Sequence, residues 1–474
     1  MAQKRALVGR RDFLEGQVPL LLGRYPDRVA PTHVINGFFA AFYEEGPAAA
    51  AVRELLRSDL VIRMPGLSHA ITENLSKTRL FRESMNVVLN PDRRVFPTAG
   101  SPFPIHASVI ASNPADDGFG RSVCELVLTH CEDAPRMLRA LMVPGERGDA
   151  LTKLGFVISN GYVPTEKINV KEITAWRWRG DLATKFSAAL AELVMNPIVC
   201  DEARLRSSRL VALTRGASCA AFLGSVRSAE FSGQVVKSWA SLAPMFVYGG
   251  VPPGPPSRPE VRLASRSFES LVASQRRALL AVLADTLGRK RPPAGVPPSQ
   301  RVEVLLALVF PEARKRVRDE AGRTVKWSDD PRKLAKALMS FLYPAGHLER
   351  GFRGMGRMIG LAGPDRGAGA PRFLLETPSM ALLVACTVKA GESIPYPDWL
   401  DRLYDRYGML AGLGTRTDVH ALLDQLGASI NLEKAIGANH EALRKRLIGA
   451  GLASEYSDGE TEVHGQPSRV KAHA

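Results

Sequence analysis

The strongest constraint on the fold is a segment that can form neither a helix nor a central strand. Residues 249–259 read GGVPPGPPSRP. Proline lacks the amide hydrogen that both kinds of element need, and glycine loses much backbone entropy when it is ordered. A second proline-rich segment, at residues 289–298, follows a long helical pattern at residues 267–287. We therefore predict a linker at residues 249–259, which limited proteolysis should cut first.

Length and composition favour a globular protein with several domains. The 474 residues amount to 51.5 kDa and are 45% hydrophobic, which is enough apolar material to bury real cores. The five cysteines are scattered, so we expect a reducing cytoplasm and no disulfide framework. Residues 10–14 (RRDFL) resemble the core of a twin-arginine export signal, but no long apolar stretch follows. The sequence contains no run of about 18 apolar residues, so we predict no membrane span.

Positive charge is concentrated in one region of the chain. The formal net charge is +15, and residues 289–373 alone hold 18 Lys and Arg against 8 Asp and Glu. Clustered cations gain free energy by displacing counterions from phosphates, which favours a nucleic-acid partner over an ordinary solvated loop. Interleaved glycines would let the backbone approach phosphates. The residues expected to contact nucleic acid here are Arg314, Lys315, Arg316, Arg318, Arg350, Arg353 and Arg357.

Residues 431–464 predict a winged helix-turn-helix by their order of elements. A helical pattern ends at a predicted turn over residues 437–439 (GAN), where Asn439 would cap a second helix over residues 440–448. The glycines at positions 449 and 451 would end that helix. The alternating stretch that follows carries Asp458-Gly459, a pair that favours the tight turn of a two-stranded hairpin.

The helix predicted at residues 440–448 would be the recognition helix. Its spacing directs Leu443 and Leu447 to the core. The residues left to face bases or phosphates are His440, Arg444, Lys445 and Arg446. Residues 431–464 nevertheless hold 4 Lys and Arg against 6 Asp and Glu, and most of these acids lie on the hairpin. Phosphates would repel such a wing, which favours contact through the upstream basic region or a wing that faces protein.

The first 248 residues predict helices and a mixed α/β part. Residues 1–90 show helical spacing, and we interpret their aromatic run at residues 38–43 as core. Residues 122–130 and 153–159 are short apolar runs typical of strands or buried helix edges. Residues 176–179 (WRWR) alternate aromatic and cationic side chains. This pattern is typical of a half-buried strand, and it could also form a face that stacks on bases. Cys124, His130 and Cys131 lie close in sequence, but no second pair of ligands follows, so we expect no metal site.

A family resemblance is confined to the C-terminal part of the chain. It is carried by WLDRLYDRYG at residues 399–408, Gly412, LRKRL at residues 443–447 and the stretch at residues 451–459. Together these resemble the C-terminal winged-helix segment of large proteins encoded in prokaryotic anti-phage defence islands. The resemblance implies a DNA-associated accessory role in defence. None of its positions is a catalytic signature.

The motifs of common enzymes are missing from the sequence. It has no GxxxxGK[ST] phosphate loop, HExxH helix, GxSxG elbow or CxxC pair. A restriction-type nuclease would need a set of acids with a lysine on adjacent strand ends, and Asp92 has no such companions at the right spacing. We therefore expect no catalytic residue and no cofactor, although metal carboxylates need not be close in sequence.

These patterns together predict a mainly α, multi-domain protein with minor β (α+β) and a C-terminal winged helix-turn-helix. The expected parts are a helical and mixed α/β region at residues 1–248, the linker at 249–259, a basic helical region at 260–376, a segment at 377–464 that ends in the winged helix, and a disordered tail at 465–474. The expected function is that of a cytoplasmic, DNA-binding accessory component of a prokaryotic anti-phage defence system. Its partners would be DNA and other proteins of that system, with no membrane. The alternative is a protein-interaction scaffold, or a subunit of a multi-protein complex, that uses the winged helix for protein contacts.

Overall fold

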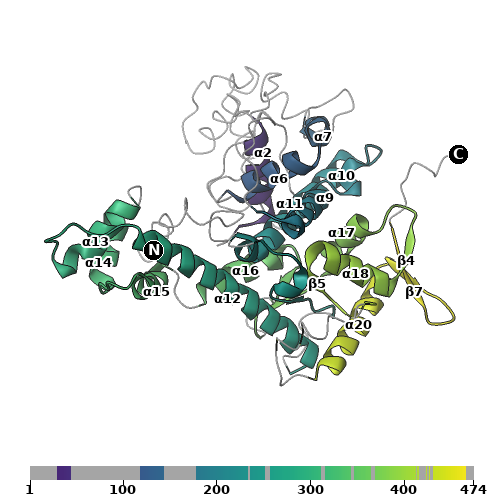
Figure 1. Ribbon diagram of the computed structural model, residues 1–474. Coiled ribbons are helices and arrows are strands. Elements are labelled where there is room, and N and C mark those ends of the chain that lie inside the picture. Colours follow the sequence, from purple (N-terminus) through teal and green to yellow (C-terminus); the bar gives the residue numbers. More distant parts are fainter. Residues whose placement is uncertain are drawn as a thin grey trace, which may run out of the picture.

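The computed structural model is predominantly helical with a few short strands, which confirms the predicted class (Figure 1). The residues that it describes are 29–43, 118–142, 178–232, 235–250, 257–310, 315–342, 346–364, 369–412, 414, 415, 423, 426 and 431–465. Predictions made for other residues, among them the run at residues 153–159, Arg314 and the tail after residue 465, lie outside this description. None of the described helices is both long enough and apolar enough to span a membrane.

The described helices of the N-terminal part build a shared apolar core. They are α2 (Pro31–Phe42), α6 (Phe119–His130), α7 (Ala134–Met142), α9 (Asp181–Val194), α10 (Pro197–Cys200) and α11 (Arg206–Ser232). The aromatic run of α2 is buried, as predicted, and residues 122–130 belong to a helix. α2 and α6 cross so closely that a Cβ on Gly120 would lie 2.2 Å from the Phe38 nitrogen. Trp178 lies outside any strand and stacks on Phe186, so the predicted WRWR strand is wrong there.

Two short pairs of strands at the centre, which we together call the central sheet, join segments that are far apart in the chain. β1 (Met245–Phe246) pairs in parallel with β5 (Met409–Leu410), and β2 (Ala362–Gly363) pairs antiparallel with β3 (Arg372–Phe373). Tyr248 connects the two pairs, because its amide donates to the Phe373 carbonyl and its carbonyl accepts from the Leu375 amide, both at 3.1 Å. The described segments before and after residues 249–259 therefore belong to one hydrophobic core.

The helix α12 (Pro259–Gly288) connects this centre to a peripheral arm. Its 30 residues make it about 45 Å long. Pro259 begins it, at a position where the missing amide hydrogen has no cost. One end of α12 packs against β1, β3 and the C-terminal helix α20 (Leu432–Gly449). At its other end lie α13 (Pro298–Val309), α14 (Lys315–Thr324) and α15 (Pro331–Leu342), which we call the arm, at the left of Figure 1.

The C-terminal segment combines helices with a three-stranded antiparallel sheet. Its elements in chain order are α17 (Thr377–Thr387), β4 (Ser393–Pro395), α18 (Tyr396–Tyr407), β5, α20, β6 (Ala453–Glu455) and β7 (Thr461–His464). The strand order is β4-β7-β6, so the strand before α18 pairs with the last strand of the chain. The predicted hairpin is confirmed, and Gly459 in its turn has a φ of 83° that favours glycine.

The predicted turn at residues 437–439 is wrong, because α20 runs through it as one helix. Asn431 caps this helix, since its side chain accepts a hydrogen bond from the Lys434 amide. Asn439 lies in the helix interior and is fully buried. Its carboxamide bonds to backbone groups of Val247, Gly249 and Ala411, just beyond β1 and β5, rather than to its own helix, so it does not act as a cap. The expected two-helix unit within residues 431–448 is therefore absent.

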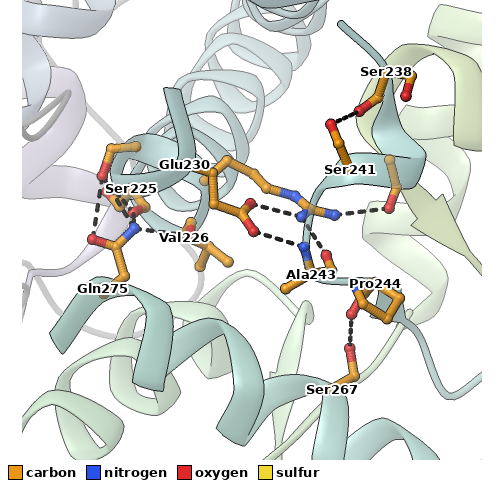
Figure 2. Close-up of polar contacts among 12 residues, drawn as sticks. Ser225, Val226, Glu230, Ser238, Ser241, Ala243, Pro244, Ser267 and Gln275 are labelled. Carbon is orange, nitrogen blue, oxygen red and sulfur yellow. Dashed lines mark hydrogen bonds and ion pairs between the residues drawn. The ribbon is translucent and has the colours of Figure 1, made fainter. Parts of the chain in front are cut away.

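A buried ion pair ties α11 to the segments around the central sheet (Figure 2). Arg227 is 1% exposed, and its Nη1 lies 2.8 Å from Glu230 Oε2. The same guanidinium donates to the carbonyls of Ala243 and Gly408, and Glu230 accepts from the Ala243 amide. Gln275 of α12 donates to two carbonyls of α11. Because these contacts are buried and internal, we assign the network a structural role and not a ligand-binding role.

Candidate nucleic-acid interface

The arm carries basic side chains on its outer surface. Residues 315–336 hold 8 Lys and Arg against 4 Asp and Glu. The exposed cations are Lys315, Arg323, Lys326, Arg332, Lys333 and Lys336. Arg318 is half-buried, while Arg314 and the side chain of Arg316 lie outside the described residues. The residues that we expected to contact nucleic acid included the start of α14 but none of α15. The helical spacing of the basic residues in α15 could have indicated that they share an exposed face.

The interior of the arm fixes these cations on a folded scaffold. Apolar side chains of α13 and α15 are buried between the helices and α12. Trp327, in the α14–α15 connection, donates its indole N–H to Asp329 (3.0 Å), and the Arg301 guanidinium lies 5.8 Å from its ring centre. Arg301 also donates to the Val296 carbonyl. The surface cations therefore project from packed helices, so binding a ligand orders their side chains but requires little ordering of the backbone.

A second basic stripe lies on α16 (His347–Met358), the helix that follows the arm. Arg350, Arg353 and Arg357 are spaced by three and four residues, which places them on one face of the helix. Arg350 and Arg357 are exposed and Arg353 is half-buried. The opposite face is packed so tightly that a Cβ on Gly356 would lie 2.8 Å from the Phe222 ring. All three predicted arginines thus belong to one rigidly held surface.

Arg444 of α20 is already occupied by carboxylates of the protein. Its Nε lies 2.9 Å from Glu441, and its Nη1 lies 2.6 Å from Glu455 on the hairpin. Its side chain is 19% exposed. The hydrogen bond from Arg444 lowers the pKa of Glu441 to about 2, so this carboxylate stays charged at neutral pH. A phosphate would have to displace two anions to reach this guanidinium.

Arg446 turns toward the central sheet instead of outward. Its Nη1 donates to the carbonyls of Gly249, Gly250 and Leu375, and its Nη2 donates to Thr377 Oγ1 at 3.2 Å. Burial lowers the pKa of this guanidinium. The expectation that Arg446 points toward a ligand therefore disagrees with its contacts, which hold residues 249–250 against the start of α17.

His440 and Lys445, the remaining two residues of the predicted recognition surface, differ in exposure. The ring of His440 lies 4.6 Å from the ring of Tyr396, whose hydroxyl donates to the His440 carbonyl (3.0 Å). Burial lowers the pKa of His440, so its ring is neutral at pH 7. Lys445 is 71% exposed and lies 3.2 Å from Glu441. Of the four residues expected to face nucleic acid here, Lys445 alone is well exposed. Leu443 and Leu447 are buried, as predicted.

The hairpin presents an acidic surface at the opposite end of the molecule from the arm (Figure 1). Residues 453–464 contain four carboxylates and no Lys or Arg. Glu455 binds Arg444, and Glu462 accepts a hydrogen bond from the hydroxyl of Tyr456, which is 48% exposed. Asp458 and Glu460 are exposed at the turn. Among the described residues, the arm is thus basic and the hairpin acidic.

The cysteines and histidines of the described residues do not assemble a metal centre. No group of three or more His, Cys, Asp or Glu side chains is placed to hold an ion in this part of the chain. Cys124 is buried inside α6, and burial raises its pKa. Burial also raises the pKa of Cys131 to about 11, so both thiols are protonated at neutral pH.

The described residues form a helical protein with basic surfaces on the arm and on the central helix α16, and with an acidic hairpin at the end away from the arm (Figure 1). Comparison with protein-family models, with curated proteins and with solved structures finds no match to this chain. The candidate site therefore rests on the side chains that the structure brings together.

Proposed function

We propose that this protein is a non-catalytic, DNA-binding accessory component of a prokaryotic anti-phage defence system, acting in the cytoplasm. The observation that carries DNA binding is the array of exposed Lys and Arg side chains on the arm and on α16. Such arrays bind phosphates with a free energy that comes largely from counterion release. The role in defence rests on the resemblance of the C-terminal segment and is the part that needs a test in cells.

The topology of the C-terminal segment supports its assignment to the winged-helix class. Among the described residues, α17, β4, α18, the short strand β5, α20 and the hairpin follow one another, and β4 joins the hairpin as its third strand. In this assignment α18 and α20 would be the two helices of the motif. The residues between them are far more numerous than in a tight helix-turn-helix, and the basic side chains of α20 are largely engaged. We therefore place DNA contact on the arm and α16, not on α20.

A salt series tests the proposed function directly. The affinity for a labelled duplex, measured by fluorescence anisotropy, should fall steeply between low and moderate salt. Reversing Lys315 and Arg323 on α14 to Glu should weaken binding, because both cations are exposed. The matched control reverses Lys185 and Lys237, which are exposed on the body of the protein. Equal losses in the two variants, or no binding by the unchanged protein, would overturn the proposal.

The acidic hairpin favours a second candidate function, that of a protein-interaction scaffold. The exposed carboxylates of Asp458 and Glu460 at its turn, together with the exposed Tyr456, suit a basic protein surface better than a nucleic acid. Co-purification from the native host distinguishes the two candidates. A partner that is lost on replacing Asp458 and Glu460 with Lys, and is still recovered after nuclease has removed all DNA, would support the scaffold.

A further inference from the structure

The two basic surfaces occupy different positions along α12. α15 packs on the end of α12 that carries the arm, whereas α16 packs on α12, α11 and β2 near the central sheet (Figure 1). We call Arg332, Lys333 and Lys336 the arm surface. We call Arg350, Arg353 and Arg357 the α16 surface. Because α12 is one continuous helix, it separates the two surfaces by a fixed distance.

Both surfaces are held rigidly by the packing beneath them. In α15 the intervening side chains Leu334 and Leu338 are buried. In α16 a Cβ on Gly356 would lie 2.5 Å from the Ala362 side chain, so this helix cannot lift without losing a close contact with β2. The relative position of the two surfaces is therefore a property of the fold, not of the short connection at residues 343–346.

The side chains of these surfaces are all Lys and Arg, which bind phosphates and, among base edges, pair with guanine. Neither α15 nor α16 contains an Asn or Gln, the residues that read adenine. Phosphate contacts from Lys and Arg position a protein without reading sequence. Phe341 and Phe352 are buried, so among the described residues of α15 and α16 no exposed aromatic ring offers a stacking platform for unpaired bases. This chemistry favours a duplex backbone over a single strand.

We propose that the arm surface and the α16 surface bind the backbone of one duplex as two separated contacts that do not depend on sequence. This inference rests on the proposed DNA-binding function and adds the kind of DNA and the manner of binding. A short duplex can occupy one surface at a time. A duplex long enough to reach both makes the second contact intramolecular, which raises the overall affinity without a new kind of contact.

The experiment measures affinity against duplex length with the full chain. Duplexes from about 8 to about 30 base pairs span about 27 to about 100 Å at 3.4 Å per step. Three variants are compared: Lys333→Glu with Lys336→Glu on the arm surface, Arg350→Glu with Arg353→Glu on the α16 surface, and Lys185→Glu with Lys237→Glu as the control of equal charge change. Thermal unfolding confirms that each variant is folded.

The unchanged protein and the control should gain about tenfold or more in affinity once a duplex spans both surfaces. Each surface variant should lose this step and keep only the gradual rise, in proportion to the number of binding positions, that a longer duplex gives any non-specific binder. A scrambled duplex should bind equally well, and a single strand of the same length more weakly. Length-independent binding, a strong sequence preference or a preference for single strands would overturn the two-contact inference while leaving DNA binding intact. Failure to bind any nucleic acid would overturn the proposed function itself.

Discussion

The Oδ1 atom of Asn439 accepts a hydrogen bond from the amide of Gly249 at 2.8 Å, across 190 residues of the chain. The Nδ2 atom of the same side chain donates to the carbonyls of Val247 and Ala411. One buried side chain of α20 thereby satisfies backbone groups just beyond β1 and β5. These contacts join the C-terminal helix to the central sheet and fix the residues that lead into the proline-rich segment.

Replacing Asn439 with Ala should destabilise the protein by about 3 kcal/mol, because three buried backbone groups lose their partner. The matched control is Asn431→Ala, which removes the cap of the same helix and should cost about 1 kcal/mol. Urea unfolding followed by circular dichroism measures both values. A smaller loss for the Asn439 variant than for the Asn431 variant would show that its contacts with Gly249 and Val247 contribute little.

Replacing Gly437 with Ala tests whether α20 is one helix. Gly437 lies inside the helix with open space where a Cβ would be, so the change should stabilise the protein by about 0.5–1 kcal/mol. A turn at residues 437–439 would give the opposite sign. Gly408→Ala serves as the contrast, because Gly408 has a φ of 64° and a Cβ there would lie 2.5 Å from the Trp239 ring. That variant should be clearly destabilised in the same urea assay.

Local signals in the sequence were sufficient for some elements and not for others. Asp458-Gly459 determines its hairpin turn through neighbouring residues, so the hairpin could be predicted. Asn439 resembled a helix cap because its partners, Val247, Gly249 and Ala411, are far away in sequence. Arg446 was expected at the surface for the same reason, since the carbonyls it binds lie at residues 249, 250 and 375. Contacts between distant segments thus decide where this sequence departs from its local pattern.

In the candidate site, too, local patterns could be predicted from the sequence, whereas contacts between distant segments could not. The arginines of α16 could be assigned to one face from their spacing alone, because helical periodicity is a local property. The pairing of Arg444 with Glu455 could not, since it depends on how the hairpin folds back on α20. Charge counted along the sequence therefore locates the basic region, while the exposure and partners of each cation required the structure.

The pairing of Glu441 with Arg444 and Lys445 should make stability depend on pH. The pKa of Glu441 is lowered from 4.5 to about 2 in the folded protein. A lowered pKa means that the carboxylate contributes stability above about pH 4.5, and that this contribution is lost as pH falls toward 2. The difference in free energy of unfolding between the unchanged protein and Glu441→Gln should therefore shrink over this range. A difference that stays constant down to pH 2 would contradict the pairing.

Single charge reversals on α14 and α20 decide which of them contacts DNA. Lys315→Glu changes an exposed cation of the arm, and Lys445→Glu changes the well-exposed cation of α20, which already lies 3.2 Å from Glu441. The Lys315 variant should bind a duplex more weakly and show a salt slope reduced by about 0.9, the value for one lost phosphate contact. The Lys445 variant should change little, because the carboxylates of α20 and the hairpin already oppose phosphate there. Arg444 and Arg446 are unsuitable for this comparison, since both hold the fold together. A loss of affinity from the Lys445 variant alone would move the contact surface from the arm to α20.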